Sequence, residues 1–170
     1  LRRITGETFP SGQPNTFLYT VKEPLGVVGL ITPWNFPIAI PAWKALPALV
    51  AGNTVVLKPA SLAPISSYHL VNALVDAGLP AGVLNMVTGP GSTVGAEIAT
   101  NPRVKAVSFT GSNATGSRLY DEVTGRNAKC QCEMGGKNPV IVLADADIER
   151  AVKEVIAGAM FSTRDRKSVV

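Results

Sequence analysis

Short runs of apolar residues alternate with segments of helical spacing along most of the chain. Runs of this length that are rich in Val, Ile and Leu are typical of buried strands. They predict strands at 26–31, 54–58, 82–87, 105–110 and 139–143. Near the start of the chain, Phe17, Tyr19 and Val21 occupy alternate positions, which predicts a half-exposed strand.

Longer segments between these strands repeat their apolar residues at the spacing of a helix face. They predict helices at 38–52, 64–78, 92–100, 112–123 and 148–161. Gly52 and Gly78 end the first two helices in the usual way, and Pro64 is typical of a first helical turn. Asp147 precedes the last helix and is expected to act as its N-cap.

Apolar strands that alternate with helices indicate an α/β fold, in which helices cover both faces of a parallel sheet. In such folds, ligands bind beyond the carboxyl ends of the strands. Polar or glycine-containing loops follow four of the predicted strands at this edge, and they read TPWNFP, KPAS, TGPGSTVG and FTGSNATG. Each alone is compatible with an ordinary turn, but together they predict a ligand site along one edge of the sheet.

The composition is apolar for a chain of 170 residues, since 46% of the residues are hydrophobic and 16% are charged. Charged residues make up about 25% of a typical domain. Part of the surface is therefore expected to be covered by another domain or subunit. A single domain that is unusually hydrophobic would have the same composition. The net charge of +4 is scattered, without a basic stripe carrying aromatic residues, so no nucleic-acid partner is expected.

Neither a membrane span nor a metal site is expected. The uncharged segment 24–43 contains four prolines, which a membrane-spanning helix of about 20 residues would not accommodate. One histidine and two cysteines provide no Cys/His cluster for a metal. Cys130 and Cys132 are too close in sequence to bridge each other readily. This cysteine usage is consistent with a reducing, cytoplasmic location.

Four motifs occur in the order and at the spacing of one family. They read PWNFP at 33–37, GNTVVLKPA at 52–60, FTGSNATG at 109–116 and EMGGKNP at 133–139. Between Phe17 and Phe161 the chain resembles the aldehyde dehydrogenase superfamily, and most of all its semialdehyde-oxidising members. The resemblance implies an incomplete Rossmann-like cofactor domain, NAD or NADP as cofactor, and oxidation of an aldehyde to a carboxylic acid.

The resemblance assigns catalytic roles to two residues. Asn35 would donate its side-chain amide to the oxyanion that forms when a thiolate attacks the aldehyde, a contact that contributes roughly 10²–10³ in rate. Glu133 would be the general base that deprotonates the thiol or the deacylating water. Without the resemblance, Asn35 would be a turn residue between prolines, and Glu133 a structural carboxylate at a strand end. Lys44 matches a lysine near the catalytic end, to which no role is assigned.

The resemblance also implies which residues contact the cofactor. They are Ile31, Trp34, Lys58, Ser61, Gly91, Gly95, Gly111, Ser112, Gly116 and Gly135. Lys58 and Ser61 would hold the adenosine ribose, and Ser112 would bind the pyrophosphate at a helix N-terminus, where free backbone amides favour anions. Many NAD-preferring relatives carry Glu where this chain has Ser61. Because serine does not repel a 2′-phosphate, NADP is expected to be tolerated beside NAD.

The family's nucleophilic cysteine does not occur where the pattern places it. The motif Phe-x-x-Gly-Gln-x-Cys, aligned on Phe161, puts its remaining fixed positions on Arg164, Asp165 and Lys167. Truncation, a frame change or a true variant would each explain the difference. The two cysteines of the chain belong to the strand that leads into the expected base, so they do not replace the nucleophile.

These observations divide the chain into an oligomerisation-type strand arm at 1–24, a partial NAD(P)-binding domain at 25–161 and a divergent tail at 162–170. By resemblance, the full-length protein is expected to be an NAD(P)-dependent aldehyde dehydrogenase that forms a homodimer or tetramer. The alternative is a catalytically inactive nucleotide-binding or interaction module from a truncated gene. The residue at position 167 in the full gene distinguishes the two.

Overall fold

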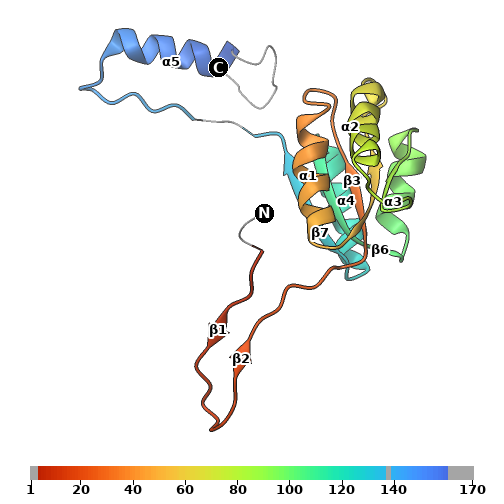
Figure 1. The fold of residues 1–170 in the computed structure, drawn as a ribbon. Coiled ribbons are helices and arrows are strands. Elements are labelled where there is room, and N and C mark those ends of the chain that lie inside the picture. Colours follow the sequence, from red (N-terminus) through yellow and green to blue (C-terminus); the bar gives the residue numbers. More distant parts are fainter. Residues whose placement is uncertain (1–3, 137–138, 161–170) are drawn as a thin grey trace. The chain divides into compact units, whose positions relative to one another are not determined.

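The computed structural model describes residues 4–136 and 139–160 of the chain (Figure 1). Contacts between residues divide the chain into two compact units, with the boundary between Glu133 and Met134. Each unit is described by itself. Among the described residues, no helix has both the length and the apolar character that crossing a membrane requires.

A five-stranded sheet forms the centre of the first unit, with the order β5-β4-β3-β6-β7. Its strands are β3 (Val27–Ile31), β4 (Thr54–Lys58), β5 (Leu84–Met86), β6 (Val104–Gly111) and β7 (Lys129–Met134). The pairs β3–β4, β3–β6 and β4–β5 are parallel. This confirms the parallel sheet that the apolar runs predict, because strands buried on both faces need no polar alternation.

Helices cover both faces of this sheet. They are α1 (Ala39–Val50), α2 (Pro64–Asp76), α3 (Ala96–Thr100) and α4 (Asn113–Gly125), and a single π-helical turn, η1 (Gly91–Gly95), precedes α3. In the sheet, β4 and β5 lie on one side of β3, and β6 and β7 lie on its other side. Right-handed crossovers therefore put α1 and α2 on one face, and α3 and α4 on the opposite face (Figure 1).

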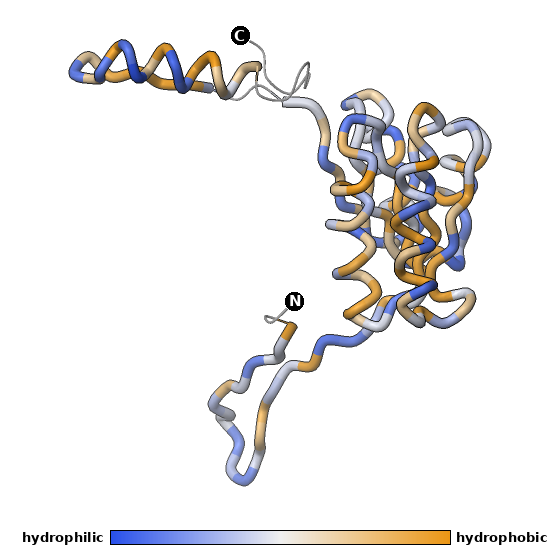
Figure 2. The backbone as a smooth tube through the Cα atoms, turned by 45° about the horizontal axis from the view of Figure 1, so that its top comes forward, coloured by the Kyte–Doolittle hydropathy of each residue, from blue (hydrophilic) through white to orange (hydrophobic). Residues whose placement is uncertain are grey.

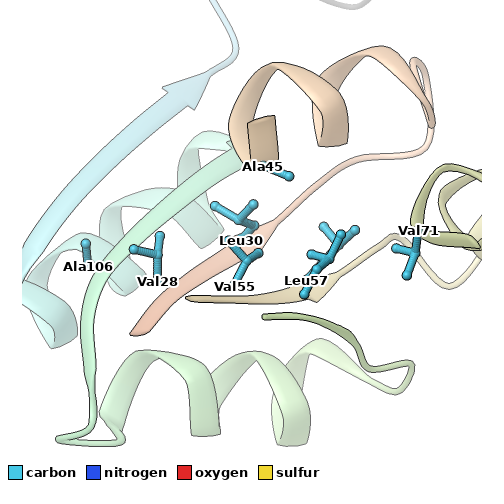
Figure 3. Close-up of a cluster of buried hydrophobic side chains, with 8 residues drawn as sticks. Val28, Leu30, Ala45, Val55, Leu57, Val71 and Ala106 are labelled. Carbon is cyan, nitrogen blue, oxygen red and sulfur yellow. The ribbon is translucent and has the colours of Figure 1, made fainter. Parts of the chain in front are cut away.

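The core lies on both sides of the sheet. Under α1 and α2, one buried cluster consists of Val28, Leu30, Ala45, Val55, Leu57, Val71, Leu84 and Ala106 (Figure 3). Val28 and Leu30 alternate along β3, as Val55 and Leu57 do along β4, so both pairs point to the same face. The other face buries Ile98, Ala99, Val107, Phe109, Leu119 and Val123. Apolar stretches of the tube gather in the strands of this sheet (Figure 2), whereas large apolar residues near the start of the chain and on α1, such as Phe17 and Trp43, are exposed.

The side chain of buried Asn53 links the segment just before β3 to the last turn of α1. Its Oδ1 accepts hydrogen bonds from the backbone amides of Leu25 at 2.7 Å and Gly26 at 3.2 Å. Its Nδ2 donates to the carbonyl oxygen of Ala48 at 2.9 Å. One side chain therefore satisfies three backbone groups from two segments of the chain.

We expect Asn53→Ala to lower the free energy of unfolding by about 1–3 kcal/mol, because it removes the side-chain oxygen that accepts from the partly buried amides of Leu25 and Gly26. Equilibrium denaturation in urea measures this change. Asn85→Ala is the matched control, since exposed Asn85 makes only one local bond, to Gly82; its effect should stay within about 0.5 kcal/mol. Equal losses in the two variants would contradict this role of Asn53.

Three segments differ from the sequence prediction. The segment 139–143 is not a strand, because no described residue pairs with it and a strand requires a hydrogen-bonded neighbour. The helix predicted at 92–100 begins as the π-helical turn η1, whose two terminal glycines place no side chains in the wide turn. The strand predicted around 17–21 is reduced to β2 (Leu18–Tyr19), which pairs with β1 (Thr8–Phe9) in an antiparallel hairpin that the sequence analysis did not predict.

The second unit contains α5 (Ile148–Met160), which begins after its predicted cap: Asp147 Oδ1 accepts from the backbone amide of Arg150 at 3.1 Å. Hydrophilic and hydrophobic stretches alternate along its turns (Figure 2). Its apolar residues recur every four positions, as expected for a helix with one apolar face. They are Ile148, Val152, Ile156 and Met160, and all are exposed.

Candidate active site and cofactor cavity

Glu133 lies near the carboxyl end of β7, on the first unit's polar edge. Thr110 of β6 donates a hydrogen bond from Oγ1 to Glu133 Oε2 at 3.1 Å. Lys44 of α1 places its Nζ 3.9 Å from the same oxygen. The other oxygen, Oε1, has a long contact of 3.5 Å from Gln131 Nε2. The carboxylate is thus anchored through one oxygen, and its side chain remains 49% exposed.

A polar network extends from this carboxylate along the α1 face of the sheet. Buried Lys44 donates from Nζ to Ser108 Oγ at 2.8 Å. Ser108 Oγ in turn donates to Gln131 Oε1 at 2.5 Å. The pairs Ser108–Gln131 and Thr110–Glu133 advance together by two residues on each strand, as neighbouring side chains do across parallel strands. The network therefore follows from the register of β6 against β7.

A cavity of about 350 Å³ opens beside this network. Its polar wall consists of Lys44, Asn53, Ser108, Gln131 and Glu133. Its apolar wall includes Ile40 and Trp43 of α1. Ligand cavities are typically lined by apolar side chains with a few convergent polar groups, and this cavity has that composition. Glu133 and Lys44 were identified from the sequence motifs, whereas the contributions of Ser108, Thr110 and Gln131 were not.

The loop after β3 contains two buried polar atoms without partners. Thr32 Oγ1 and Asn35 Oδ1 are buried, and neither forms a hydrogen bond within the described part of the chain. The Thr32 backbone amide donates to the Lys58 carbonyl oxygen at 3.2 Å, which joins the loops after β3 and β4. A buried polar group without a partner costs about 1–3 kcal/mol, so such groups in a native fold are candidates for contact with a ligand.

A second cavity, of about 420 Å³, lies between the η1–α3 segment and α4. It brings together three of the residues expected to contact the cofactor, namely Ile31, Gly91 and Gly95. Thr115 and Arg118 of α4 also line it, and the sequence analysis did not include them. They lie three and six residues after Ser112 on the helix that it begins, and the packing of α4 against α3 brings them to the cavity.

Ser112, the first residue of the helix predicted at 112–123, is the N-cap of α4 (Asn113–Gly125). Its Oγ accepts from the Thr115 backbone amide at 3.4 Å, and its backbone is extended. Before it, Gly111 leaves no room for a side chain, since a Cβ there would lie 2.5 Å from the Phe109 ring. Gly116 is buried on the first turn of the helix. The N-terminus of α4 therefore lies just beyond the carboxyl end of β6. The free backbone amides of a helix N-terminus favour binding of an anion.

The remaining predicted cofactor residues do not line this cavity. Lys58 is buried, its Nζ donates to the Pro59 carbonyl oxygen at 3.2 Å, and desolvation lowers the pKa of its ammonium group. Exposed Ser61 donates from Oγ to the Gly89 carbonyl oxygen at 3.4 Å, near the start of η1. Trp34 is exposed, and Gly135 belongs to the second unit.

Comparison with known proteins agrees with the motifs. The model of the aldehyde dehydrogenase family matches residues 1–166. The chain belongs to this family. A curated relative, the alpha-ketoglutaric semialdehyde dehydrogenase of Bacillus subtilis (strain 168), is 53% identical over 161 residues, which are 95% of this chain and 33% of the relative. The chain therefore spans about a third of the length of this aldehyde dehydrogenase.

Solved structures show that the fold is that of aldehyde dehydrogenases. An E. coli NADP dependent enzyme superposes with a TM-score of 0.89 and 45% identity, covering 95% of this chain and 33% of the other. A betaine aldehyde dehydrogenase double mutant from Staphylococcus aureus, in complex with NAD+, gives a TM-score of 0.86 and 38% identity over 92% of this chain and 32% of the other. Both similarities extend over nearly all of this chain.

Proposed function

We propose that this chain forms most of the NAD(P)-binding part of an enzyme that oxidises an aldehyde, and more narrowly a semialdehyde, to a carboxylic acid. The observation that carries the proposal is Glu133, a half-exposed carboxylate held by Thr110 and Lys44 beside a cavity along the α1 face of the sheet. The family supports aldehyde oxidation, and the semialdehyde is supported by the name of the Bacillus subtilis relative.

In this proposal Glu133 is the general base. Thr110 donates to Oε2, and the Lys44 ammonium lies 3.9 Å from the same oxygen. Among the described residues Oε1 has the long contact from Gln131 alone, and we assign proton acceptance to this oxygen. The proton comes from a nucleophilic thiol or from the water that hydrolyses the resulting thioester. A positioned base of this kind contributes roughly 10²–10⁴ in rate.

The proposed cofactor residues fit a dinucleotide. Ile31, Gly91 and Gly95 line a cavity large enough for part of it, and the N-terminus of α4 at Ser112 suits a pyrophosphate. Buried Lys58 would contribute a cation at the ribose. NAD(P) supplies the acceptor for the hydride that leaves the aldehyde carbon. The remaining proposed contacts are Trp34, Ser61, Gly111, Gly116 and Gly135.

Asn35 is the proposed donor to the oxyanion. Its Oδ1 is buried without a hydrogen-bond partner among the described residues, so the amide is not committed through that atom to a structural bond. Prolines at 33 and 37 limit the conformations of the loop that carries it. A restrained amide donor directed at developing negative charge stabilises the transition state without reorganisation.

Ser61→Glu tests the placement of the ribose. In a complete enzyme carrying this domain, the added carboxylate should weaken NADP binding by about tenfold to a hundredfold, because like charges near the 2′-phosphate repel each other. NAD binding should be little changed. Ser61→Gln, which adds similar bulk without charge, is the control. If cofactor titration shows the same NADP affinity in Ser61→Glu as in the parent, the placement of Ser61 is wrong.

The β1–β2 hairpin supports a proposal about assembly. Phe9, Phe17, Leu18, Tyr19 and Val21 are all exposed on it. A two-stranded hairpin alone is marginally stable, and an exposed apolar strand edge invites pairing with another chain. We expect the full-length protein to be a homodimer or tetramer in light scattering. A monodisperse monomer at micromolar concentration would contradict this expectation.

A second candidate function is favoured by the residues at the family's nucleophile motif. Arg164, Asp165 and Lys167 stand where Gly, Gln and Cys are expected, and they lie outside the described residues. A chain with Lys at position 167 in the full gene would be an inactive nucleotide-binding or interaction module. Resequencing of the gene across this position distinguishes the two functions.

A further inference from the structure

The two cysteines of the chain lie side by side on β7. Cys130 and Cys132 are both free and half-buried, and their Sγ atoms are 3.6 Å apart. Cys132 Sγ also contacts the Gly116 carbonyl oxygen of α4 at 3.7 Å. Gln131 and Glu133 alternate with them and face α1, so the two thiols lie on the opposite, α4 side of the strand.

This separation is too long for a disulfide and suits one bridging atom. A disulfide requires a sulfur–sulfur bond of about 2.05 Å and a Cα separation of at most about 6.8 Å. Residues two apart in a strand are separated by about 6.6 Å, whereas a disulfide brings its Cβ atoms to about 3.5–4.5 Å, so a direct bond would bend β7. A single soft atom bonded to both sulfurs would leave the strand extended.

We propose that Cys130 and Cys132 form a dithiol site for trivalent arsenic compounds of the organoarsenical class. With phenylarsonous acid, two arsenic–oxygen bonds break and two arsenic–sulfur bonds form. Each hydroxyl leaves arsenic with one thiol proton as a molecule of water, and neither arsenic nor sulfur changes its oxidation state. The product is a ring that joins the two side chains across Gln131.

The surroundings favour arsenic over other thiol reagents. Burial and the neighbouring Cys132 raise the pKa of Cys130 to about 12, so this thiol stays protonated at neutral pH. Alkylating reagents need the thiolate and should react slowly with it, whereas the condensation above consumes neutral thiols. In the part of the chain that the structure describes, no group of three or more His, Cys, Asp or Glu could hold a metal, so the four-ligand set of structural zinc is not available.

Mass spectrometry of the intact 170-residue chain tests the site. Because the chain contains only two cysteines, one equivalent of phenylarsonous acid should add a single phenylarsenic group with loss of two protein hydrogens. During a challenge with excess glutathione, this adduct should persist roughly 10²-fold longer than adducts of Cys130→Ser or Cys132→Ser, because two linked bonds must break together. Cys130→Ala serves as a second variant if serine disturbs the half-buried site, and circular dichroism verifies the fold of each variant.

Two outcomes would overturn the proposal. One is addition of two phenylarsenic groups, one on each thiol, at stoichiometric reagent. The other is loss of the parent adduct to glutathione at the same rate as from the single-cysteine variants. Retention in the parent and rapid loss from both variants would support it. The test measures no enzyme activity, so its result is independent of the proposed function.

Discussion

Glu133→Gln is expected to slow aldehyde oxidation by roughly 10²–10⁴-fold in a complete enzyme that carries this domain. Glutamine has nearly the same shape and keeps an oxygen that can accept the hydrogen bond from Thr110. It loses the charge opposite Lys44 and the ability to accept a proton. Turnover should therefore fall strongly, while the dissociation constants for NAD and NADP stay nearly unchanged.

The matched control for this substitution is Glu97→Gln. Exposed Glu97 also accepts a side-chain hydrogen bond, from Asn101 Nδ2 at 2.6 Å, and glutamine can accept it equally. Its turnover should equal that of the parent. If steady-state kinetics show that Glu133→Gln retains parental turnover, Glu133 is a structural carboxylate. If cofactor affinity falls in proportion to turnover, its role lies in cofactor binding.

The 170-residue chain as written is expected to show no aldehyde oxidation, even with saturating cofactor. Its position for the nucleophile holds Lys167, and a base without its nucleophile performs no acyl chemistry. Loss of a covalent nucleophile removes the whole pathway, because residues that act as a unit do not contribute additively. NAD(P)H formation from a short-chain semialdehyde, followed by absorbance, is the measurement. Clear turnover would show that another group acts as the nucleophile.

The strands β3, β4, β5 and β6 could be predicted from the sequence, because they are apolar runs between clear helix signals, whereas β7 alternates exposed Lys129, Gln131 and Glu133 with half-buried residues and has no such run. Gly52 and Gly78, both with positive φ, follow α1 and α2 where the pattern placed their ends. The segment 139–143 has an equally strong apolar run, yet it pairs with no described strand. Apolar periodicity shows that a segment suits a strand, but it does not show which neighbour will pair with it.

The motifs pointed to Glu133 and Ser112, which the structure places beside Lys44 and at the N-terminus of α4, and their roles stay predictions. Ser108 and Gln131 are common polar residue types in strands, and nothing in their spacing reveals that they join Lys44 to the carboxylate. Their contact depends on the register of β6 against β7, which local patterns do not encode. Arg118 was missed for a similar reason, since it reaches the second cavity only after the crossover places α4 beside α3.

The most direct measurement uses a chimera in which residues 1–160 replace the matching third of the Bacillus subtilis relative. That partner provides the other two thirds of an enzyme named for semialdehyde oxidation. If this segment carries the cofactor site and the base, the chimera should form NAD(P)H from a semialdehyde, and Glu133→Gln in the same chimera should reduce the rate by roughly 10²–10⁴-fold. A folded chimera that binds NAD(P) but forms no NAD(P)H, or one whose rate does not depend on Glu133, would contradict this account.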